Sequence, residues 1–320
     1  MRYLTQYKPA GTRSFRLASA QLFGFGGNAQ NNDKDSMDIF QAPPGWKFVQ
    51  RDQSGAEALI VAYLCRPGRY RNLFIHGVKP HTYVALHLFI DKFRGNHPKE
   101  RYWLKDPTEL KALPEWPHLN KVIKDSKFEY DIGKRTGHAS NYKMGPNTFR
   151  ESTLKESEGS LVLSYADAQF YLATYKDLFP EIVVWQAEIE KTVRAHRLLR
   201  NLYGFPRRFE RELTDSYIRE AISWIPQSTV GCITHEAFEK TCVYIREHNL
   251  DWRPISNKHD SFALMVRDTD VNVARDVMKA HLNVTLQGTD SAFTMASDFQ
   301  VGQNLKKWSD YNPYGMKEAA

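Results

Sequence analysis

Cysteine is scarce in this sequence. Its three cysteines, Cys65, Cys232 and Cys242, lie far apart, and no two of them are spaced as C-x-x-C. This distribution excludes a zinc site built from paired cysteines and a scaffold held together by disulfides. A sparse and odd number of cysteines is typical of a protein from a reducing compartment, so we expect a cytoplasmic location.

Long apolar runs are also missing. No stretch approaches the roughly 20 apolar residues that a membrane-spanning helix requires. The N-terminal residues, MRYLTQYKPAGTRSF, lack the apolar core of a secretion signal. We therefore expect no contact with a membrane.

What the sequence does contain is an ordinary globular composition with an excess of basic residues. Of its 320 residues, 42% are hydrophobic and 25% are charged, which is typical of a folded globular protein. The net charge of +7 favours an acidic partner, most often nucleic acid. Charge alone leaves open a basic surface that binds nothing.

The segment WKFVQRDQSGAEALIVAYL, residues 46–64, is the most informative one. It predicts a strand over Trp46–Arg51 that ends on the carboxylate of Asp52, and then a helix with an apolar face. Glu57 lies one turn into that helix. A carboxylate at the end of a strand can hold a hard metal ion. It can equally be a helix cap, and on this window alone the cap is the commoner case.

A second acidic segment lies near the end of the chain. Apolar runs around Ile255 and at 262–266 flank His259-Asp260, a pattern that predicts a hairpin with this dipeptide at its turn. The sequence cannot show whether Asp260 meets Asp52. If the two carboxylates met, they could hold a pair of Mg²⁺ ions, the arrangement that supports nucleotidyl transfer.

A third candidate is the predicted helix at 127–141. Lys134, His138 and Tyr142 recur at every fourth position and would share one helix face. A cation followed by two rings on one face suits a triphosphate with its base stacked beyond it. A helix face that is merely solvated is an equally good interpretation.

The remaining pattern indicates α+β order. Helices are predicted at 79–93, 183–201 and 270–282, and another at 230–248, entered through Pro226-Gln-Ser-Thr229. Residues 94–118, rich in Pro, Lys and Trp, are predicted to form a surface insertion.

In chain order, the acidic segments resemble those of family A DNA polymerases, the DNA polymerase I family, and particularly its phage-like members. RDQSGAE at 51–57 is similar to the family's first acidic motif, D-x-S-x-x-E, and His259-Asp260 is similar to its final H-D-E motif. The resemblance implies that Asp52 and Asp260 are the catalytic carboxylates and that they bind two Mg²⁺ ions. A viral source would make the location the host cytoplasm.

The helix at 127–141 is similar to the family's nucleotide-binding fingers helix. The resemblance implies that Lys134 binds the phosphates of the incoming dNTP, that His138 stacks on the nucleotide, and that Tyr142 lies near the template base. It also implies that Glu57 excludes a ribose 2′-OH. His81-Thr82 resembles a His-Thr pair that follows the first acidic motif.

Other segments resemble the parts of the family that hold primer–template DNA. These are Arg16 with the Gly-Gly-Asn-Ala-Gln-Asn run, Tyr203-Gly-x-x-Arg207-Arg208, and Pro226-Gln227-Ser228-Thr229. The resemblance runs from about Arg13 to Val266. The implied DNA-binding residues are Arg16, Asn28, Gln30, Arg207, Arg208, Gln227 and His259.

The sequence departs from the family pattern at two places that concern catalysis. Ser261 stands where the third motif has Glu, so one carboxylate is missing. Tyr130 stands four residues before Lys134, where the family has an Arg that binds the triphosphate. Both departures weaken the catalytic inference without excluding it.

The resemblance implies an α+β palm with an antiparallel sheet and a mainly helical fingers subdomain. We expect the palm at 1–94 and 181–320, the fingers at 95–180 with the nucleotide-binding helix near 127–145, and no thumb or exonuclease domain. The implied function is template-directed DNA synthesis from dNTPs on primer–template DNA, with a separate polypeptide supplying a thumb or an exonuclease.

Two other functions remain open. The first is a catalytically weak or inactive DNA-binding subunit of a split polymerase, which the departures at Ser261 and Tyr130 favour. The second is an RNA-synthesising relative on the same scaffold, against which Glu57 argues because a bulky acid would crowd the 2′-OH.

Overall fold

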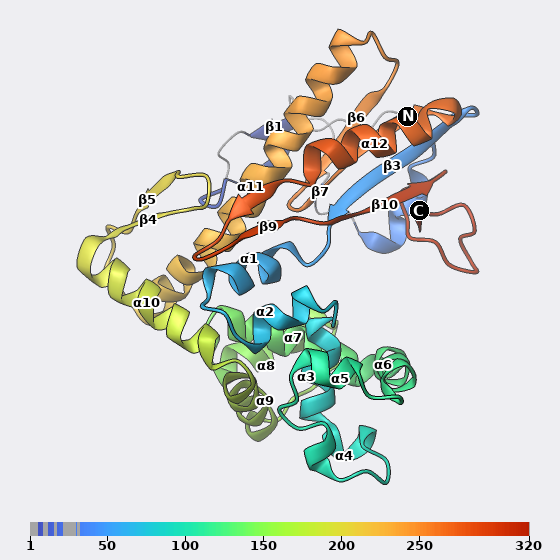
Figure 1. Ribbon diagram of the computed structural model, residues 1–320. Coiled ribbons are helices and arrows are strands. Elements are labelled where there is room, and N and C mark those ends of the chain that lie inside the picture. Colours follow the sequence, from blue (N-terminus) through green and yellow to red (C-terminus); the bar gives the residue numbers. More distant parts are fainter. Residues whose placement is uncertain (1–5, 9–11, 16–17, 22–29, 31–32, 320) are drawn as a thin grey trace.

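The computed structural model describes residues 6–8, 12–15, 18–21, 30 and 33–319. Its central feature is a five-stranded antiparallel sheet, accompanied by helices from the middle and the end of the chain (Figure 1). The predicted fold class, α+β with an antiparallel sheet, is confirmed. In sheet order the strands are β11 (Lys317–Glu318), β10 (Ser297–Gly302), β3 (Trp46–Gln53), β7 (Ser261–Arg267) and β6 (Arg253–Lys258).

Most of the remaining elements are helices. Short strand pairs are formed by β1 (Gln6–Lys8) with β2 (Ala18–Ala20), β4 (Leu198–Arg200) with β5 (Pro206–Arg208), and β8 (Thr285–Gln287) with β9 (Ala292–Thr294). The α-helices are α1 (Ala56–Leu64), α2 (Arg69–Ile75), α3 (Pro80–Leu88), α4 (Ile90–Phe93), α5 (Pro107–Lys111), α6 (Trp116–Asp125), α7 (Lys127–Asn141), α8 (Pro146–Glu156), α9 (Tyr165–Leu178), α10 (Pro180–His196), α11 (Asp215–Glu247) and α12 (Val271–Leu282). The 3₁₀ helices are η1 (Lys34–Ile39), η2 (Lys99–Arg101) and η3 (Asp268–Asp270).

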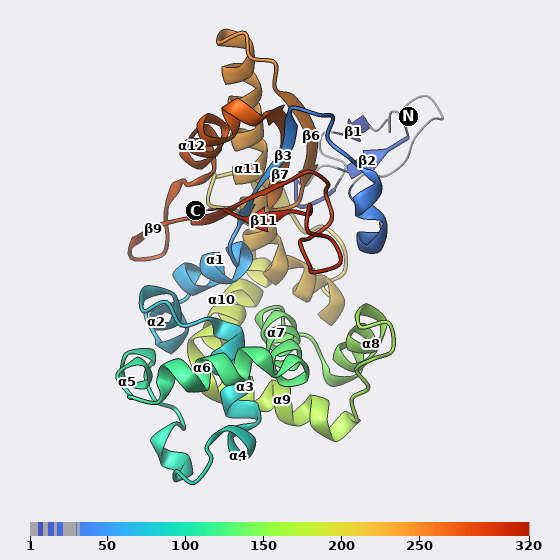
Figure 2. The same ribbon diagram turned by 90° about the vertical axis from the view of Figure 1, so that its right-hand side faces the viewer.

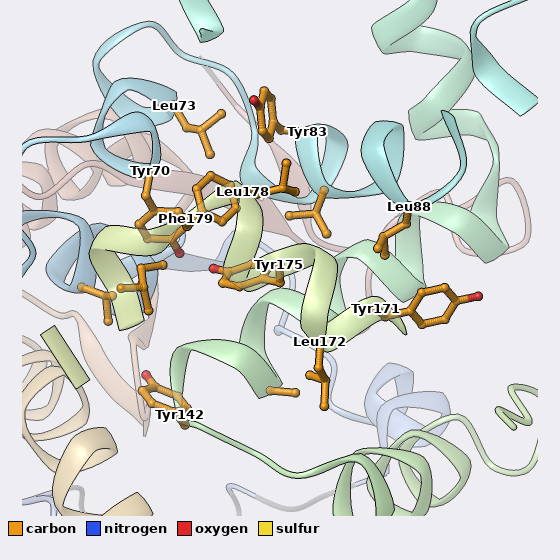
Figure 3. Packing of buried hydrophobic residues seen from close by; sticks show 14 of the residues in the cluster. Tyr70, Leu73, Tyr83, Leu88, Tyr142, Tyr171, Leu172, Tyr175, Leu178 and Phe179 are labelled. Carbon is orange, nitrogen blue, oxygen red and sulfur yellow. The ribbon is translucent and has the colours of Figure 1, made fainter. Parts of the chain in front are cut away.

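Two bodies share the molecule, as both ribbon views show (Figures 1 and 2). The sheet body consists of the five-stranded sheet with α11 and α12 on one face. The helical body consists of α2 to α9, with α1 and α10 at the junction. Its core is rich in tyrosine and phenylalanine, including Tyr70, Tyr175 and Phe179, whose rings meet edge to face (Figure 3).

The alternation of β3 gives its two faces different roles. Val49 faces α11 and α12 and packs into an apolar core with Leu264 and Met278. Trp46 and Phe48 point the other way, into a small cluster at the far end of the strand. Because alternate side chains of a strand lie on the same face, Asp52 shares this second face, which α11 and α12 do not cover.

The hairpin predicted around His259-Asp260 is confirmed: β6 and β7 pair across this turn. The predicted helix at 270–282 is also confirmed, as α12. The predicted helix start at Val230 is wrong, because α11 begins at Asp215 and runs through Pro226. Proline removes a backbone donor and disfavours a helix interior. Here the buried apolar residues on both sides of Pro226 outweigh that local preference.

Residues 94–118 are not simply a surface insertion. They include η2, α5 and the start of α6, and they bury Tyr102, Leu110 and Trp116 in the core of the helical body. No α-helix in the part of the chain that the structure describes is long and apolar enough to span a membrane.

Candidate active site

The end of β3 lies directly beside the turn between β6 and β7. Asp52 pairs with Ser261 in the antiparallel register, and the Gln53 N–H donates to the Asp260 carbonyl at 3.0 Å. Strand pairing therefore brings Asp52 and Asp260 together from opposite ends of the sequence. Neither their roles nor their metal binding follows from this placement alone.

Electrostatics show that these carboxylates influence one another. Burial raises the pKa of Asp52 to about 7, and the negative charges of Asp260 and Asp298 act in the same direction. The Lys307 ammonium opposes them. The cause is desolvation together with like charge, a combination that is common at functional sites.

Hydrogen bonds from buried polar side chains of α11 and β3 hold the turn that carries Asp260 in place. His259 has a positive φ of 31°, an uncommon conformation for a residue other than glycine. Its carbonyl accepts a hydrogen bond from Thr234 Oγ1 of α11 at 3.0 Å, and Gln53 Nε2 donates to the same hydroxyl at 2.8 Å. The end of β3, the turn and α11 are thus fixed to one another, while the His259 side chain is exposed.

Asp298 is an acidic residue of this site that the sequence analysis missed. It lies on β10 directly opposite Asp52, so the two side chains share one face of the sheet. The Ser54 hydroxyl donates to its carboxylate. Ser261, which follows Asp260 in the sequence, is buried. No signal marked Asp298, because its strand is short and its apolar alternation is weak.

The carboxylates of Asp52 and Asp260 supply too few ligands to bind a divalent cation alone. Oxygens of a substrate would have to complete its coordination shell. Among the described residues, no three histidine, cysteine, aspartate or glutamate side chains are grouped as a complete metal site. Mg²⁺ often takes one or two carboxylates and completes its shell with water and substrate phosphates. Asp52 and Asp260 match that requirement, because a cation between them would relieve their repulsion.

A second group of candidates lies on and after α7. Lys134 and His138 are exposed on this helix, as expected for a face that meets a ligand. Tyr142 lies just beyond the helix, which ends at Asn141, so the predicted face is one residue too long. Its ring is buried, 7% exposed, and meets the His138 ring edge to face at 5.2 Å.

Glu57 links this group to β3. The Tyr142 hydroxyl donates to Glu57 Oε2 of α1, the helix that follows Asp52 in the chain. The first acidic motif and the end of α7 are therefore joined by one hydrogen bond. Both residues stand at the junction of the sheet body and the helical body.

Positive charge collects around His81. Burial, with the charges of Lys134, Lys79 and His138 acting in the same direction, lowers the pKa of His81 to about 4. Its ring meets the Tyr130 ring edge to face at 5.8 Å. The lysines whose charges act on His81 could attract an anionic ligand such as a triphosphate.

The candidate DNA contacts are dispersed. Gln30 Nε2 donates to the Asn257 carbonyl at 2.9 Å, near the turn of the hairpin. Arg207 pairs with Glu220 and lies over the Phe209 ring at 4.6 Å, so it is engaged within the protein. Arg208 is exposed on β5. Gln227 lies on α11, two turns before the Thr234 that anchors the hairpin turn. Arg16 and Asn28 lie outside the described residues.

Comparison with known proteins gives a match at the level of the fold. No protein-family model and no curated protein matches this chain. Among solved structures, the fold is similar to that of the POL domain of Pol1 from M. smegmatis, in complex with DNA primer-template and dNTP, with a TM-score of 0.65 and 17% sequence identity. The match covers 94% of this chain and 47% of that chain, so this chain spans about half the length of the matched one. An identity this low establishes the shared fold alone.

Proposed function

We propose that this chain is a template-directed DNA polymerase of the family A type, phage-like, that adds dNTPs to a primer 3′-OH. The observation that carries the proposal is the meeting of Asp52 and Asp260 at one end of the sheet, on a fold similar to that of a polymerase domain. The fold alone would not carry it, because one fold hosts many functions.

In this proposal the carboxylates bind metal and the α7 face binds nucleotide. Asp52 and Asp260 would hold two Mg²⁺ ions, and Asp298 would take the part of the acid missing at Ser261. When bound, the ions lower the pKa of the primer hydroxyl and stabilise charge on the leaving pyrophosphate. The Lys134 ammonium neutralises the triphosphate, and the cationic surroundings of His81 support that role.

The remaining residues position the substrates. Glu57, oriented by Tyr142, crowds a ribose 2′-OH, and the His138 ring stacks on the nucleotide. Gln30, Arg208, Gln227 and His259 hold the primer–template, together with Arg207 and with Arg16 and Asn28 from the undescribed segments. Contacts of this kind to the DNA backbone fix register without reading sequence.

We also propose the division into palm and fingers. Residues 1–94 and 181–320 would form the palm and residues 95–180 the fingers. The helix α3, near the end of the first proposed palm segment, packs against α7 of the proposed fingers. A separate polypeptide with a thumb or an exonuclease, and a cytoplasmic location, belong to the same proposal.

A primer-extension assay tests the proposal directly. With Mg²⁺, dNTPs and a primed template, the wild-type chain should extend the primer, and rNTPs should be poor substrates. Asp260→Asn should abolish extension while DNA binding persists, and Asp298→Asn should reduce it by roughly tenfold. Asp177→Asn, the same change at an exposed aspartate on α9, is the matched control.

The second candidate is a DNA-binding subunit without activity of its own. The buried Ser261 and the Tyr130 beside His81 favour it, because both replace charged groups of the family. Intact DNA binding with no extension, even after a thumb-bearing partner is added, would select this function over the first.

A further inference from the structure

We propose that the loop 303–316, named here the aromatic loop, is a stacking site for the bases of single-stranded DNA. It presents three aromatic rings to solvent: Trp308 is 43% exposed, Tyr314 is 71% exposed and Tyr311 is 101% exposed. Exposed aromatic rings can serve as platforms on which unpaired bases stack. The site rests on the proposed DNA-dependent function and extends it to a segment to which the resemblance gives no role.

The aromatic loop is held in one shape by its own hydrogen bonds. Asn304 and Asn312 exchange side-chain amide hydrogen bonds of 2.8 and 3.1 Å, and Asn312 Nδ2 also donates to the Lys307 carbonyl at 3.1 Å. The Met316 N–H donates to the Lys306 carbonyl at 2.7 Å. A side chain at Gly315 would collide with Asn312 and with that same carbonyl.

The aromatic loop is also fixed to the rest of the molecule. Gln303 Nε2 donates to the Ala42 carbonyl at 2.7 Å, and Lys306 Nζ donates to the Asp35 carbonyl of η1 at 2.7 Å. The exposed rings are therefore presented by a rigid scaffold. A surface that is ordered before it binds loses less entropy when a base stacks on it.

The position of the aromatic loop connects it with the candidate active site. Met316 packs with Trp46 and Phe48 on the sheet face that Asp52 shares. The Lys307 ammonium is close enough to lower the pKa of Asp52. A DNA strand that reaches Asp52 along this face would pass the exposed rings.

The charges of the aromatic loop favour stacking over ionic attraction. Lys317 Nζ lies 4.9 Å from the centroid of the Trp308 ring, a cation–π contact that also leaves a cation beside a passing phosphate. In the aromatic loop and directly after it, the exposed acids Asp310 and Glu318 balance the exposed lysines Lys307 and Lys317. Because the net charge is this small, we expect stacking of unpaired bases on the rings, which tolerates any base sequence, to supply most of the affinity.

Fluorescence anisotropy with a labelled oligothymidylate of about 20 nucleotides, a length that covers one such binding site, tests the proposal. It is measured with EDTA and without dNTPs, so that catalysis plays no part. The triple variant W308A/Y311A/Y314A should bind at least about tenfold more weakly. The triple phenylalanine variant keeps the rings and should bind like the wild type. Binding of blunt duplex DNA should not change.

Two further variants make the result decisive. Y165A/F170A removes two rings of similar exposure, 49% and 53%, from α9 and should leave the affinity unchanged. Tyr311→Ala alone alters a side chain without contacts to the fold and should still weaken binding several-fold, which separates lost stacking from misfolding. The deficit should persist at high salt, because stacking is not screened.

The outcomes separate this site from the proposed polymerase function. If the affinity of the triple variant for the oligonucleotide is within twofold of the wild-type affinity, the aromatic loop is not a stacking site, even if the wild-type chain extends primers. A change in oligomeric state without a change in DNA binding also overturns it. The wild-type chain could extend no primer while the triple variant loses single-strand binding. That result would support the stacking site in the aromatic loop and contradict the proposed polymerase function.

Discussion

The sheet body and the helical body each contain a titratable group with a strongly shifted pKa, half-buried Asp52 in the first and fully buried His87 in the second. Burial raises the pKa of Asp52 to about 7 in one and lowers the pKa of His87 to about 4 in the other. His87 is satisfied in its neutral form: Nδ1 donates to the Tyr83 carbonyl at 2.8 Å and Nε2 accepts from the Leu104 N–H at 3.1 Å. Asp52 instead faces two other carboxylates.

This difference shows that a shifted pKa has to be interpreted from the groups that surround the residue. Neutral His87 has both nitrogens occupied and is part of the packing of the helical body. Asp52 is destabilised by Asp260 and Asp298 when ionised, and this repulsion can be relieved only by a proton or a cation. The size of the pKa shift does not distinguish a packing residue from a candidate site residue. The hydrogen-bond partners and neighbouring charges of each group do.

The largest effect is expected from Asp52→Asn. Primer extension should fall by roughly 10³-fold or more, since the substitution removes a proposed metal ligand. The free energy of unfolding of the variant should instead be higher than that of wild type at pH 8. The folded pKa of Asp52 lies above its unfolded value of 3.8, so the folded state binds the extra proton between about pH 4 and pH 7, and wild-type stability falls as the pH rises through that window.

The variant lacks that ionisation and should be more stable than wild type at pH 8 by roughly 1 to 3 kcal/mol. Chemical unfolding at pH 5 and pH 8 measures the difference, and primer extension measures the loss of activity. A variant that is less stable than wild type at pH 8 would show that the carboxylates do not repel one another.

His87→Gln should reveal the opposite pH dependence in the helical body. The folded pKa of His87, about 4, lies below its ordinary value of 6.5, so the unfolded state binds the extra proton between these values. The contribution of neutral His87 to the free energy of unfolding is therefore fully present above pH 6.5. Up to about 3 kcal/mol of it is lost as the pH falls toward 4.

Urea unfolding between pH 7 and pH 4 should show a shallower loss of stability for His87→Gln than for wild type, although the variant is less stable overall. His118→Gln, an exposed change on α6, should leave the slope as it is. Equal slopes for His87→Gln and wild type would mean that His87 is protonated in the folded state.

The sequence predicted the parts of this molecule that local patterns encode. Asp52 at a strand end and Asp260 at a hairpin turn were both marked by alternation and turn residues. Asp298 was not, because β10 contains one buried apolar side chain before Gly302, and its place beside Asp52 comes from its pairing with β3. That pairing links residues from opposite ends of the chain, and no local signal records it.

The misplaced start of α11 has a related cause. Pro226 and the polar residues after it favour a turn locally, and only the core on both sides keeps the helix continuous. Tyr142 shows the converse. The helix α7 has the predicted bounds, 127–141, but Tyr142, predicted to share its ligand-facing side with Lys134, lies just after the helix with its ring buried. Tertiary packing decided both outcomes.

Lys134→Ala should distinguish the exposed α7 face from the carboxylate site. The KM for dNTP should rise by roughly tenfold to a hundredfold with a smaller change in kcat, because an ammonium-to-phosphate contact is lost while the metal site is kept. Lys134→Arg should recover much of the loss. Lys176→Ala, an exposed lysine on α9, is the control. An unchanged KM would mean that this face is merely solvated.

The smallest effect is expected at the hydrogen bond that joins the two bodies. Tyr142→Phe keeps the ring against His138 but removes the donor to Glu57. Glu57 then loses its fixed orientation, and discrimination against rNTPs should fall by roughly threefold to tenfold, the range of one hydrogen bond. Competitive incorporation of dNTP and rNTP measures this ratio directly.

Glu57→Gln and Glu57→Ala complete the comparison. Glutamine keeps the size of the side chain and an oxygen that can accept from Tyr142, so discrimination should persist, whereas alanine should lose more discrimination than Tyr142→Phe does. If Tyr142→Phe and Glu57→Ala in combination cost as much as Glu57→Ala alone, the tyrosine acts only through the glutamate. An additive loss would instead mean that Tyr142 contacts the nucleotide or template independently, and that the helical body contributes to sugar selection without the sheet body.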